Sequence, residues 1–405
     1  MLPQRYQVGV VGFGVAGGAL ACLLGRMGHA VTIFEQAPTV GPVGTGLLLQ
    51  PSGQGVLERL GLLDGIAAQS EPIHELHAFQ PDGRTLIHLR YDEIAPGCRA
   101  YGIHRGTLFQ ALHSRAAAEP NVCIHLNHAI ASWRPGSDGR QVFAVDAAGA
   151  AHGPFDFLVA ADGSRSRLRQ TLEPGLAGVP EYPIGALWTV GRCTQVRGYL
   201  HQVVEGTRHL LGLLPIGGER ATLFWSLPQR EMDDLRAGGF AAWREAAVRL
   251  CPLADEVLAD AGGFERVVFT TYRHTVLRRP HNAHVVCLGD AAHAMSPHLG
   301  QGANLALLDA ECLADALATA EGVRAAFQRY EADRRAHVRY YATLSRLLTP
   351  FFQSEGWLLG LGRDIALPRM SCVPPLRHHM LLAMAGVKRG LLGGTLPLPS
   401  SPPAP

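Results

Sequence analysis

The chain has 405 residues, enough to bury a large core in one domain or in two closely joined ones. Its composition, with 47% hydrophobic and 17% charged residues, is that of an ordinary globular protein. With 36 basic and 34 acidic side chains the formal net charge is +2, so charge gives no reason to expect nucleic acid or an anionic membrane as a partner.

The first predicted elements alternate between strand and helix. Gln7–Val11 predicts a short buried strand, Val15–Met27 a helix that ends at Gly28, and Ala30–Phe34 a second strand. The run from Val8 to Gly25 carries no charge, as in a signal peptide or a membrane span, but its cationic leader is thin and its glycines have a nucleotide-binding spacing. We therefore expect a β-α-β unit and no integral membrane contact.

Strands and helices continue along the next part of the chain. The predicted set is a strand Gly46–Leu49 with a turn at Pro51-Ser52-Gly53, a short helix Gly55–Leu60, a hairpin within 73–90 around Pro81-Asp82-Gly83, a helix from Arg105 to Ala118, and strands at Asn121–Leu126, Gln141–Asp146 and Phe155–Ala160.

The pattern changes at Gly185. From there to Pro228 alternating strands are separated by glycine and proline breaks, which predicts antiparallel sheet and an inserted second subdomain. His284–Leu288 is again a buried-strand pattern and leads into a helix from about Gly302 to Ala320. After about Ala325 we expect helices, and in residues 392–405 a flexible tail rich in Gly, Pro and Ser.

The first of three glycine-centred motifs follows the first strand. In Gly12-Phe13-Gly14-Val15-Ala16-Gly17 the missing side chains let the backbone approach a pyrophosphate, and the N-terminus of the next helix faces that charge. Glu35, followed by Gln36, ends the second strand and can accept hydrogen bonds from the ribose hydroxyls of an adenosine. NAD(P) or FAD would satisfy this motif equally well.

The other two motifs each place a carboxylate at the end of a strand. Asp162-Gly163-Ser164-Arg165-Ser166 can receive a ligand hydroxyl or cap the following turn. Gly289-Asp290-Ala291-Ala292-His293 repeats the arrangement, and its histidine fits a cofactor ligand or a satisfied loop residue equally. It runs into Pro297-His298-Leu299-Gly300-Gln301-Gly302-Ala303-Asn304, a helix start whose N–H groups and dipole would stabilise negative charge on a reduced flavin ring. Together the three motifs predict one bound FAD.

In these motifs the chain resembles the single-component FAD-dependent aromatic hydroxylases, the para-hydroxybenzoate hydroxylase-like flavoprotein monooxygenases. The resemblance spans about residues 5–345, and it departs at Gly41-Pro42, where many members carry an arginine. The segments that carry it are Gly12 to Gly17 with Glu35, Arg105 as the arginine near the FAD pyrophosphate, Asp162-Gly163 to Arg169 as the motif that serves FAD and a transient NAD(P)H contact, and Gly289-Asp290 to Asp309-Ala310.

The resemblance implies an enzyme. NAD(P)H would reduce FAD when substrate is present, O2 would add at C4a of the flavin, and the hydroperoxide would give one oxygen atom to an aromatic or heteroaromatic small molecule. The protein would exclude water and orient the ring, and we assign the shielding to the backbone of Pro297 and Gly300.

The substrate is expected between the flavin and the inserted sheet. Candidate lining residues are Trp188, His201, Leu213 and Phe224, although apolar residues in these positions are also typical of an ordinary sheet core. His201 is a candidate base for a phenol, or else a histidine with no role in the reaction.

These observations predict an α/β fold with a Rossmann-like FAD-binding domain, an inserted antiparallel-sheet substrate domain and a helical C-terminal region. The FAD-binding domain would comprise residues 1–72, 99–180 and 273–345, the substrate domain a hairpin at 73–98 and a sheet at 181–272, the helical region 346–391 and the tail 392–405.

Cysteine and histidine spacing gives further expectations. The eight cysteines form no Cys-x-x-Cys and no metal-ligand spacing, and no His-Glu-x-x-His occurs among the 19 histidines. This predicts a reducing cytoplasm, no metal and no dithiol chemistry, so disulfide reductases are disfavoured, as are flavin halogenases, whose Trp-x-Trp-x-Ile-Pro signature is absent. His378-His379 is expected at the surface.

Two alternatives stay open. The apolar stretch from Leu347 to Leu382 could cover the site, form a homodimer face or touch a membrane, and it would suit a flavoprotein that epoxidises a lipophilic substrate or hydroxylates a quinone precursor. A non-oxygenating FAD protein that binds and shields a reactive product belongs to a different class.

Overall fold

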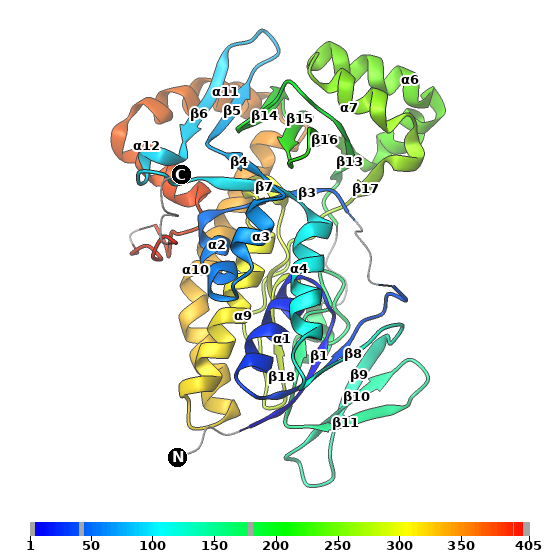
Figure 1. Ribbon diagram of the computed structural model, residues 1–405. Helices are drawn as coiled ribbons and strands as arrows, with labels where there is room; N and C mark the ends of the chain where they lie inside the picture. The colour runs from blue at the N-terminus through cyan, green and yellow to red at the C-terminus, as the bar shows by residue number, and fades with distance from the viewer. Residues whose placement is uncertain (1–4, 40–43, 177–180, 392, 400–405) are drawn as a thin grey trace.

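A five-stranded parallel sheet lies in the lower half of the molecule in Figure 1. The computed structural model describes residues 5–39, 44–176, 181–391 and 393–399. Four of the five strands are mainly buried apolar runs, as expected where both faces of a parallel sheet are covered, whereas the edge strand Val122–His125 is only partly buried. The predicted Rossmann-like arrangement is confirmed. Their spatial order is β18 (Val285–Cys287), β12 (Phe157–Ala160), β1 (Gln7–Val11), β2 (Ala30–Phe34) and β8 (Val122–His125).

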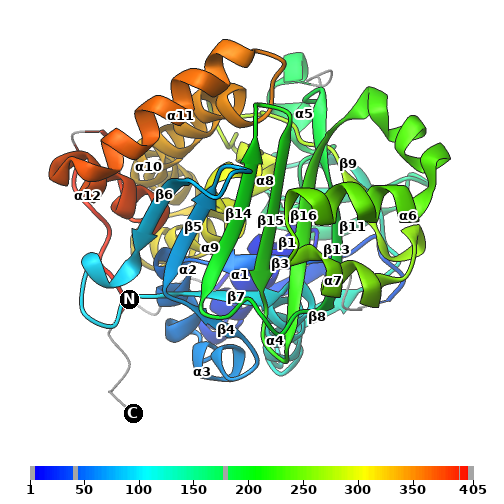
Figure 2. The ribbon, with the colours of Figure 1, turned by 90° about the horizontal axis from the view of Figure 1, so that it is seen from above.

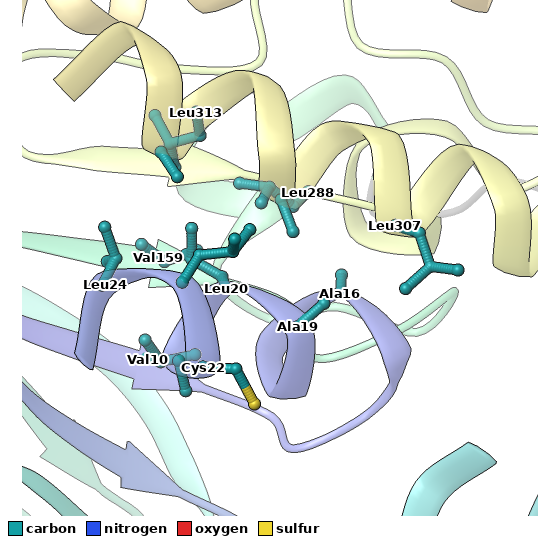
Figure 3. Packing of buried hydrophobic residues seen from close by; sticks show 14 of the residues in the cluster. Val10, Ala16, Ala19, Leu20, Cys22, Leu24, Val159, Leu288, Leu307 and Leu313 are labelled. Carbon is teal, nitrogen blue, oxygen red and sulfur yellow. The ribbon is translucent and has the colours of Figure 1, made fainter. Parts of the chain in front are cut away.

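Helix α1 (Val15–Arg26) is almost wholly buried because it packs against the sheet, α4 (Arg105–Ala117) and α9 (Gly302–Thr319). A helix surrounded on all sides is expected to be apolar all round, as α1 is. Figure 3 shows the resulting layer, in which side chains of α1 lie between strand residues and α9; its labelled residues include Ala16, Leu20 and Leu24 of α1, Val10 and Val159 of the sheet, and Leu307 and Leu313 of α9.

Two small antiparallel sheets flank this core. The predicted strand Phe155–Ala160 is divided, because Phe155 pairs with Val142 whereas residues from Phe157 onward pair with β1. The first small sheet contains β9 (Ile130–Pro135), β10 (Val142–Asp146) and β11 (Ala151–Phe155), and the second contains β3 (Gly46–Leu49), β7 (Ala100–His104) and β4 (Glu71–Ile73).

The predicted turn at Pro51 is wrong, since helix α2 spans Pro51–Arg59 and α3 (Leu63–Ala67) follows it. Proline is favoured in the first turn of a helix, where its missing N–H costs nothing, so Pro51-Ser52-Gly53 begins a helix instead of preceding one. A Cβ atom at Gly53 would lie 2.4 Å from Oδ1 of Asn304, which shows how closely α2 approaches α9.

A seven-stranded sheet forms the other large layer, with its strands side by side in Figure 2. Its pairs are antiparallel except for β14 with β5, which are parallel. The antiparallel sheet predicted over 185–228 is therefore confirmed, with the earlier hairpin added at its edge. The spatial order is β17 (Val268–Thr270), β13 (Ile184–Arg192), β16 (Arg220–Pro228), β15 (His209–Pro215), β14 (Tyr199–Glu205), β5 (Glu75–Phe79) and β6 (Thr85–Arg90).

Helices α6 (Met232–Leu250) and α7 (Ala254–Ala261) cover one face of this sheet (Figure 2). The sequence pattern predicts no helix here. Gly239 lies inside α6 with φ +85° and ψ 161°, a kink that breaks the helical spacing of apolar residues and hides the pattern.

The C-terminal region is helical, as predicted. It contains α10 (Val323–Phe352), α11 (Trp357–Cys372) and α12 (Pro374–Met384). Within the described ranges no helix has the length and apolarity needed to cross a membrane. The described part of the predicted flexible tail is partly ordered, because Thr395 forms a β-bridge with Lys388. The remaining short elements are α5 (Arg169–Leu172), α8 (Asp290–His293), η1 (Tyr91–Glu93), η2 (Pro174–Leu176), η3 (Gln229–Glu231), η4 (Phe264–Arg266) and η5 (Pro297–Leu299).

The outer side of α11 is apolar. Trp357 is 71% exposed and Leu358 63%, and Leu361 and Ile365 on the same side of the helix are exposed as well. By contrast, Arg363 is buried and donates hydrogen bonds to the carbonyl oxygens of Gly206 and Phe351. Large exposed apolar patches often mark contacts with other molecules. This face of α11 is therefore a candidate interface for the predicted homodimer, which stays a prediction.

Candidate functional site

Two glycines of the first motif are required sterically, and the third lies beside open space. Gly12 has φ +98°, and a Cβ atom there would lie 2.3 Å from the carbonyl oxygen of Ala161. A Cβ atom at Gly17 would lie 2.1 Å from the carbonyl oxygen of Gly12, so this glycine lets α1 approach the turn. At Gly14, by contrast, a Cβ atom would meet no atom of the described residues within 4 Å, its chain neighbours aside. The backbone at Gly14 therefore borders open space.

The N-terminus of α1 is suited to an anion. Gly14 is its N-cap, so no side chain caps the helix, and the first turn has no acidic residue. The N–H groups at Val15 and the buried Ala16 are in the part of a helix that lacks intrahelical partners and carries the positive end of the dipole.

Glu35 lies at the end of β2, beside this turn. Its Oε2 accepts a hydrogen bond from the N–H of Phe13 at 2.8 Å, and its Oε1 accepts one from the N–H of Ala37 at 2.8 Å. These bonds fix the carboxylate and leave each oxygen able to accept a further hydrogen bond, as ribose hydroxyls require. The next residue, Gln36, is exposed.

The second motif presents a carboxylate oxygen without a partner. Oδ2 of Asp162 accepts a hydrogen bond from the N–H of Arg167 at 2.9 Å, but Oδ1 is buried and has no hydrogen-bond partner in the described part of the chain. Burial raises the pKa of Asp162, although hydrogen bonds from Ser166 and backbone N–H groups oppose the rise. Gly163 next to it borders open space. A buried unsatisfied acceptor needs an explanation, and a ligand hydroxyl supplies one.

The third motif touches the other two. A Cβ atom at Gly289 would lie 3.2 Å from Cβ of Ala16 on α1 and 3.3 Å from Cβ of Ala306 on α9. Arg169, which follows the second motif, donates hydrogen bonds to the carbonyl oxygens of Asp290 at 3.2 Å and Ser164 at 2.7 Å. The three motifs, separated by more than a hundred residues in sequence, therefore meet at one place.

Asp290 begins α8 and supplies the carboxylate of the third motif. Its side chain is exposed, yet enclosure by protein raises the pKa of its carboxyl, against the attraction of His293, Arg105 and Arg169. Arg105 is exposed at the N-terminus of α4, on the same side of the site.

The start of α9 completes the site. Gly302 is exposed and Ala303 half-buried, the helix has no side-chain cap and no acidic residue in its first turn, and a Cβ atom at Gly302 would lie 3.9 Å from Oδ1 of Asp290. The free N–H groups at the start of this 18-residue helix therefore lie beside the Asp290 carboxylate. The loop before α9 contains η5, which begins with Pro297 and ends at Gly300.

Asn304 serves the protein itself. It is wholly buried; its Oδ1 accepts a hydrogen bond from the N–H of Gln50, and its Nδ2 donates to the carbonyl oxygens of Leu48 and Gly300. Its side chain thus positions the loop, and any contact with a cofactor would come from its backbone.

His293 is the last residue of α8, and its hydrogen bonding favours a satisfied histidine over a cofactor ligand, the two possibilities that the sequence leaves open. It is 3% exposed, and its Nε2 lies 2.5 Å from Oδ2 of Asp309. The same carboxylate accepts the N–H of Gly289 at 2.8 Å and Nε of Arg334 at 2.7 Å. Burial raises the pKa of Asp309, but His293 and Arg334 outweigh it and hold the pKa well below its ordinary value.

The strand register separates the predicted substrate residues. Trp188 is paired with Phe224, with ring centroids 5.2 Å apart, and both lie on the sheet face opposite to the core formed with α6 and α7. His201 is paired with Leu213, which belongs to that core, so both point to the outer face. A register neighbour always shares a face, so His201 and Leu213 cannot contact a ligand that lies against Trp188.

The structure adds Tyr272 to the inner face. Its hydroxyl oxygen accepts a hydrogen bond from Nε1 of Trp188 at 3.2 Å, and burial raises its pKa above the ordinary value. Arg105 partly opposes that rise, which places Tyr272 near the same cation as Asp290. No motif surrounds Tyr272, so the sequence gives no signal for it.

Comparison with known proteins identifies this arrangement. A family model described as an FAD binding domain matches residues 5–345, which include all three glycine motifs. The chain belongs to this family. The flavoprotein is 30% identical to a kynurenine 3-monooxygenase of Salinispora arenicola over 410 residues, covering 94% of this chain and 88% of that protein.

Further relatives agree with the family. The flavoprotein is 29% identical over 355 residues to a 3-amino-4-hydroxybenzoate 2-monooxygenase of Streptomyces cremeus, covering 82% of this chain and 84% of that protein. The crystal structure of Pseudomonas aeruginosa PqsL in complex with 2-aminobenzoylacetate superimposes with a TM-score of 0.78 at 26% identity, covering 88% of this chain and 99% of that one. The flavoprotein is therefore an FAD-dependent monooxygenase of the aromatic hydroxylase type.

The residues present fit FAD. The open backbone at Gly14 and the free N-terminus of α1 suit a pyrophosphate, Glu35 suits the ribose, and the unpartnered Oδ1 of Asp162 suits a hydroxyl of the ribityl chain. The N-terminus of α9 beside Asp290 suits the flavin ring. The departure at Gly41-Pro42 lies outside the described residues.

Proposed function

We propose that the flavoprotein consumes NAD(P)H and O2 to insert one oxygen atom into an aromatic or heteroaromatic small molecule, and that this molecule lies between the flavin and the inner face of the seven-stranded sheet. The observation that carries the proposal is the convergence of three FAD motifs below a sheet face that presents Trp188 and Phe224. The overall reaction would convert substrate, O2, NAD(P)H and a proton into hydroxylated substrate, NAD(P)+ and water. When bound, FAD would accept the hydride and activate O2 at C4a.

The backbone of Pro297 and Gly300 is the proposed shield against water. Asn304 holds the carbonyl oxygen of Gly300 at 3.0 Å, so the loop is fixed from α9. His298 within this loop packs against Phe352, and burial lowers its pKa to about 4, so it is a neutral imidazole at neutral pH. An uncharged and rigid loop excludes water without attracting it.

Tyr272 is the proposed polar contact to the substrate. Its oxygen accepts the Trp188 N–H, which leaves its own proton free to donate, and the raised pKa keeps the hydroxyl protonated at neutral pH. It would hold a carbonyl, carboxylate or phenolate oxygen of the substrate against the aromatic pair formed by Trp188 and Phe224. This fixes the ring in the orientation that oxygen transfer needs. His201 has no part in this proposal because it faces away.

Rapid-mixing measurements of flavin reduction test the proposal. We expect a narrow subset of a panel of phenols, heteroaromatics and alkyl quinolones to accelerate bleaching of the flavin by NADH or NADPH strongly. Mass spectrometry after a reaction under isotopically labelled O2 should show one labelled atom in the product. Equal bleaching with every compound, or an unlabelled product, would contradict the proposal; tight binding without oxygenation would favour the product-shielding alternative. Selective response to alkyl quinolones alone would favour the lipophilic-substrate alternative.

A further inference from the structure

Three potential metal ligands converge on the hairpin of β5 and β6, outside the flavin site. Within the described residues, Glu75, His77 and His88 are the one set of three or more His, Cys, Asp or Glu whose ligand atoms lie within 4.8 Å of one another. Nε2 of His88 lies 2.9 Å and Nε2 of His77 3.7 Å from the same carboxylate oxygen of Glu75.

The hairpin register brings these side chains together. His77 and His88 are directly opposed across the two strands, with ring centroids 3.7 Å apart, and Glu75 lies two residues before His77 and so on the same face. The sequence predicts no metal site, because the spacing Glu-x-His followed by a distant histidine matches no metal motif. Only the pairing register completes the set.

The donor set and its spacing suit Zn2+. Zinc takes imidazole nitrogen and carboxylate oxygen at about 2.0–2.2 Å in tetrahedral geometry, which places neighbouring ligand atoms about 3.4 Å apart. The observed separations of 2.9 and 3.7 Å lie on either side of that value, so side-chain rotations alone would complete the geometry. Three protein ligands leave the fourth position for water.

The surroundings support the carboxylate and provide access. Arg90 lies 3.9 Å from the other oxygen of Glu75, and Asp92 neutralises Arg90 through an ion pair of 2.5 Å. The ring of Tyr199 packs edge-on against His77, with centroids 5.7 Å apart. A hollow of about 430 Å³ opens beside the set and would admit the ion with its water; it is lined by His74, Glu75, Arg90, Asp92, Arg197, Gly198 and Tyr199.

We propose that Glu75, His77 and His88 bind one Zn2+ ion that stabilises the edge of the seven-stranded sheet. The site lies on the outer face, the one that carries His201 and faces away from the proposed flavin position, so the ion would take no part in the oxygenation. It would join β5 to β6, the edge strand. Arg377 of α12 donates a hydrogen bond to the carbonyl oxygen of His88, so the ion would also fix the strand on which the C-terminal helices rest.

Metal binding by untagged holoprotein tests this. After removal of metals, equilibrium dialysis against Zn2+ with metal analysis should show one more bound ion per chain in the wild type than in His77→Gln/His88→Gln, whose glutamines keep hydrogen-bonding capacity. Glu75→Gln should weaken binding at this site at least tenfold. Co2+ as a probe should give ligand-field bands at wavelengths beyond the flavin absorption, and these should vanish in the double variant. Zn2+ should raise the unfolding temperature of the wild type but not that of His77→Gln/His88→Gln.

His378→Gln/His379→Gln is the matched control, since both histidines are exposed neighbours on α12 and their predicted surface position is confirmed. It should bind as much Zn2+ as the wild type and show the same rise in unfolding temperature. Equal stoichiometry in the wild type and the His77/His88 variant would overturn the proposal, as would equal losses in both double variants. Circular dichroism of the metal-free variants checks that they fold, so a loss of binding cannot be a loss of structure.

Discussion

Replacing Asp309, the carboxylate that holds the N–H of Gly289, is predicted to lower the free energy of unfolding strongly. This carboxylate is wholly buried and accepts hydrogen bonds from His293, Arg334 and the N–H of Gly289. In Asp309→Asn the guanidinium of Arg334, only 6% exposed, keeps its charge and loses its counterion. Breaking a buried ion pair from one side costs about 3–5 kcal/mol of unfolding free energy, because the remaining charge cannot be hydrated.

Urea unfolding followed by circular dichroism measures this loss. Asp315→Asn is the control, because Asp315 lies on the same helix but pairs at the surface with Arg59, and exposed pairs contribute about 0–1 kcal/mol. Replacing both partners, as in Asp309→Leu with Arg334→Met, should restore part of the stability, since no unpaired charge remains. If Asp309→Asn and Asp315→Asn lower the unfolding free energy equally, the reasoning from burial is refuted.

Three further predictions concern the cofactor, the pH dependence and the substrate. Gly14→Ala should weaken FAD binding by about tenfold or more without lowering the stability of the apoprotein, because its Cβ would meet only ligand; Gly55→Ala, also in open space, should retain FAD. Burial and Arg334 lower the pKa of His337 to about 3. Below about pH 6.5 the unfolded chain therefore binds a proton at His337 that the folded chain does not bind, and the free energy of unfolding decreases as the pH falls. His337→Gln should reduce this pH dependence, measured from the urea midpoints. Phe224→Ala should raise KM by on the order of tenfold, whereas His201→Gln should leave kcat and KM unchanged, and a loss of kcat in His201→Gln would contradict the face assignment.

The parts of the fold that follow local steric rules could be predicted from the sequence. Gly12 and Gly17 are required because side chains there would overlap backbone atoms, and Glu35 is required where β2 ends. Such requirements recur wherever a strand, a turn and a helix enclose a pyrophosphate, so they leave a readable motif. The strands β1 and β2 and the helices α1 and α9 follow from the same regularity.

The face on which a strand residue lies could not be predicted. The strands β15 and β16 carry buried apolar residues on both faces, which pack in the cluster of α6 and α7 on one side and in clusters with the FAD-binding part and C-terminal helices on the other. Apolar residues then occur at successive positions, as in the sequence HLLGLLP of β15, and not at every second position. The sequence therefore does not show on which face Leu213 lies. The substrate prediction named two residues of each face for that reason.

Contacts between distant segments could not be predicted from the sequence either. The hydrogen-bond network around Asp309 is an example. Arg334 donates to Nδ1 of His337, whose Nε2 side lies 2.9 Å from the carbonyl oxygen of Gly386, beyond the segment that matches the family. Charged residues within the apolar pattern of α10 were the one available signal, since a buried charge must find a partner. Through this chain of hydrogen bonds the C-terminal segment supports the carboxylate that holds Gly289. We therefore expect the C-terminal region, which no motif describes, to influence how rigidly Gly289 and the third motif are positioned.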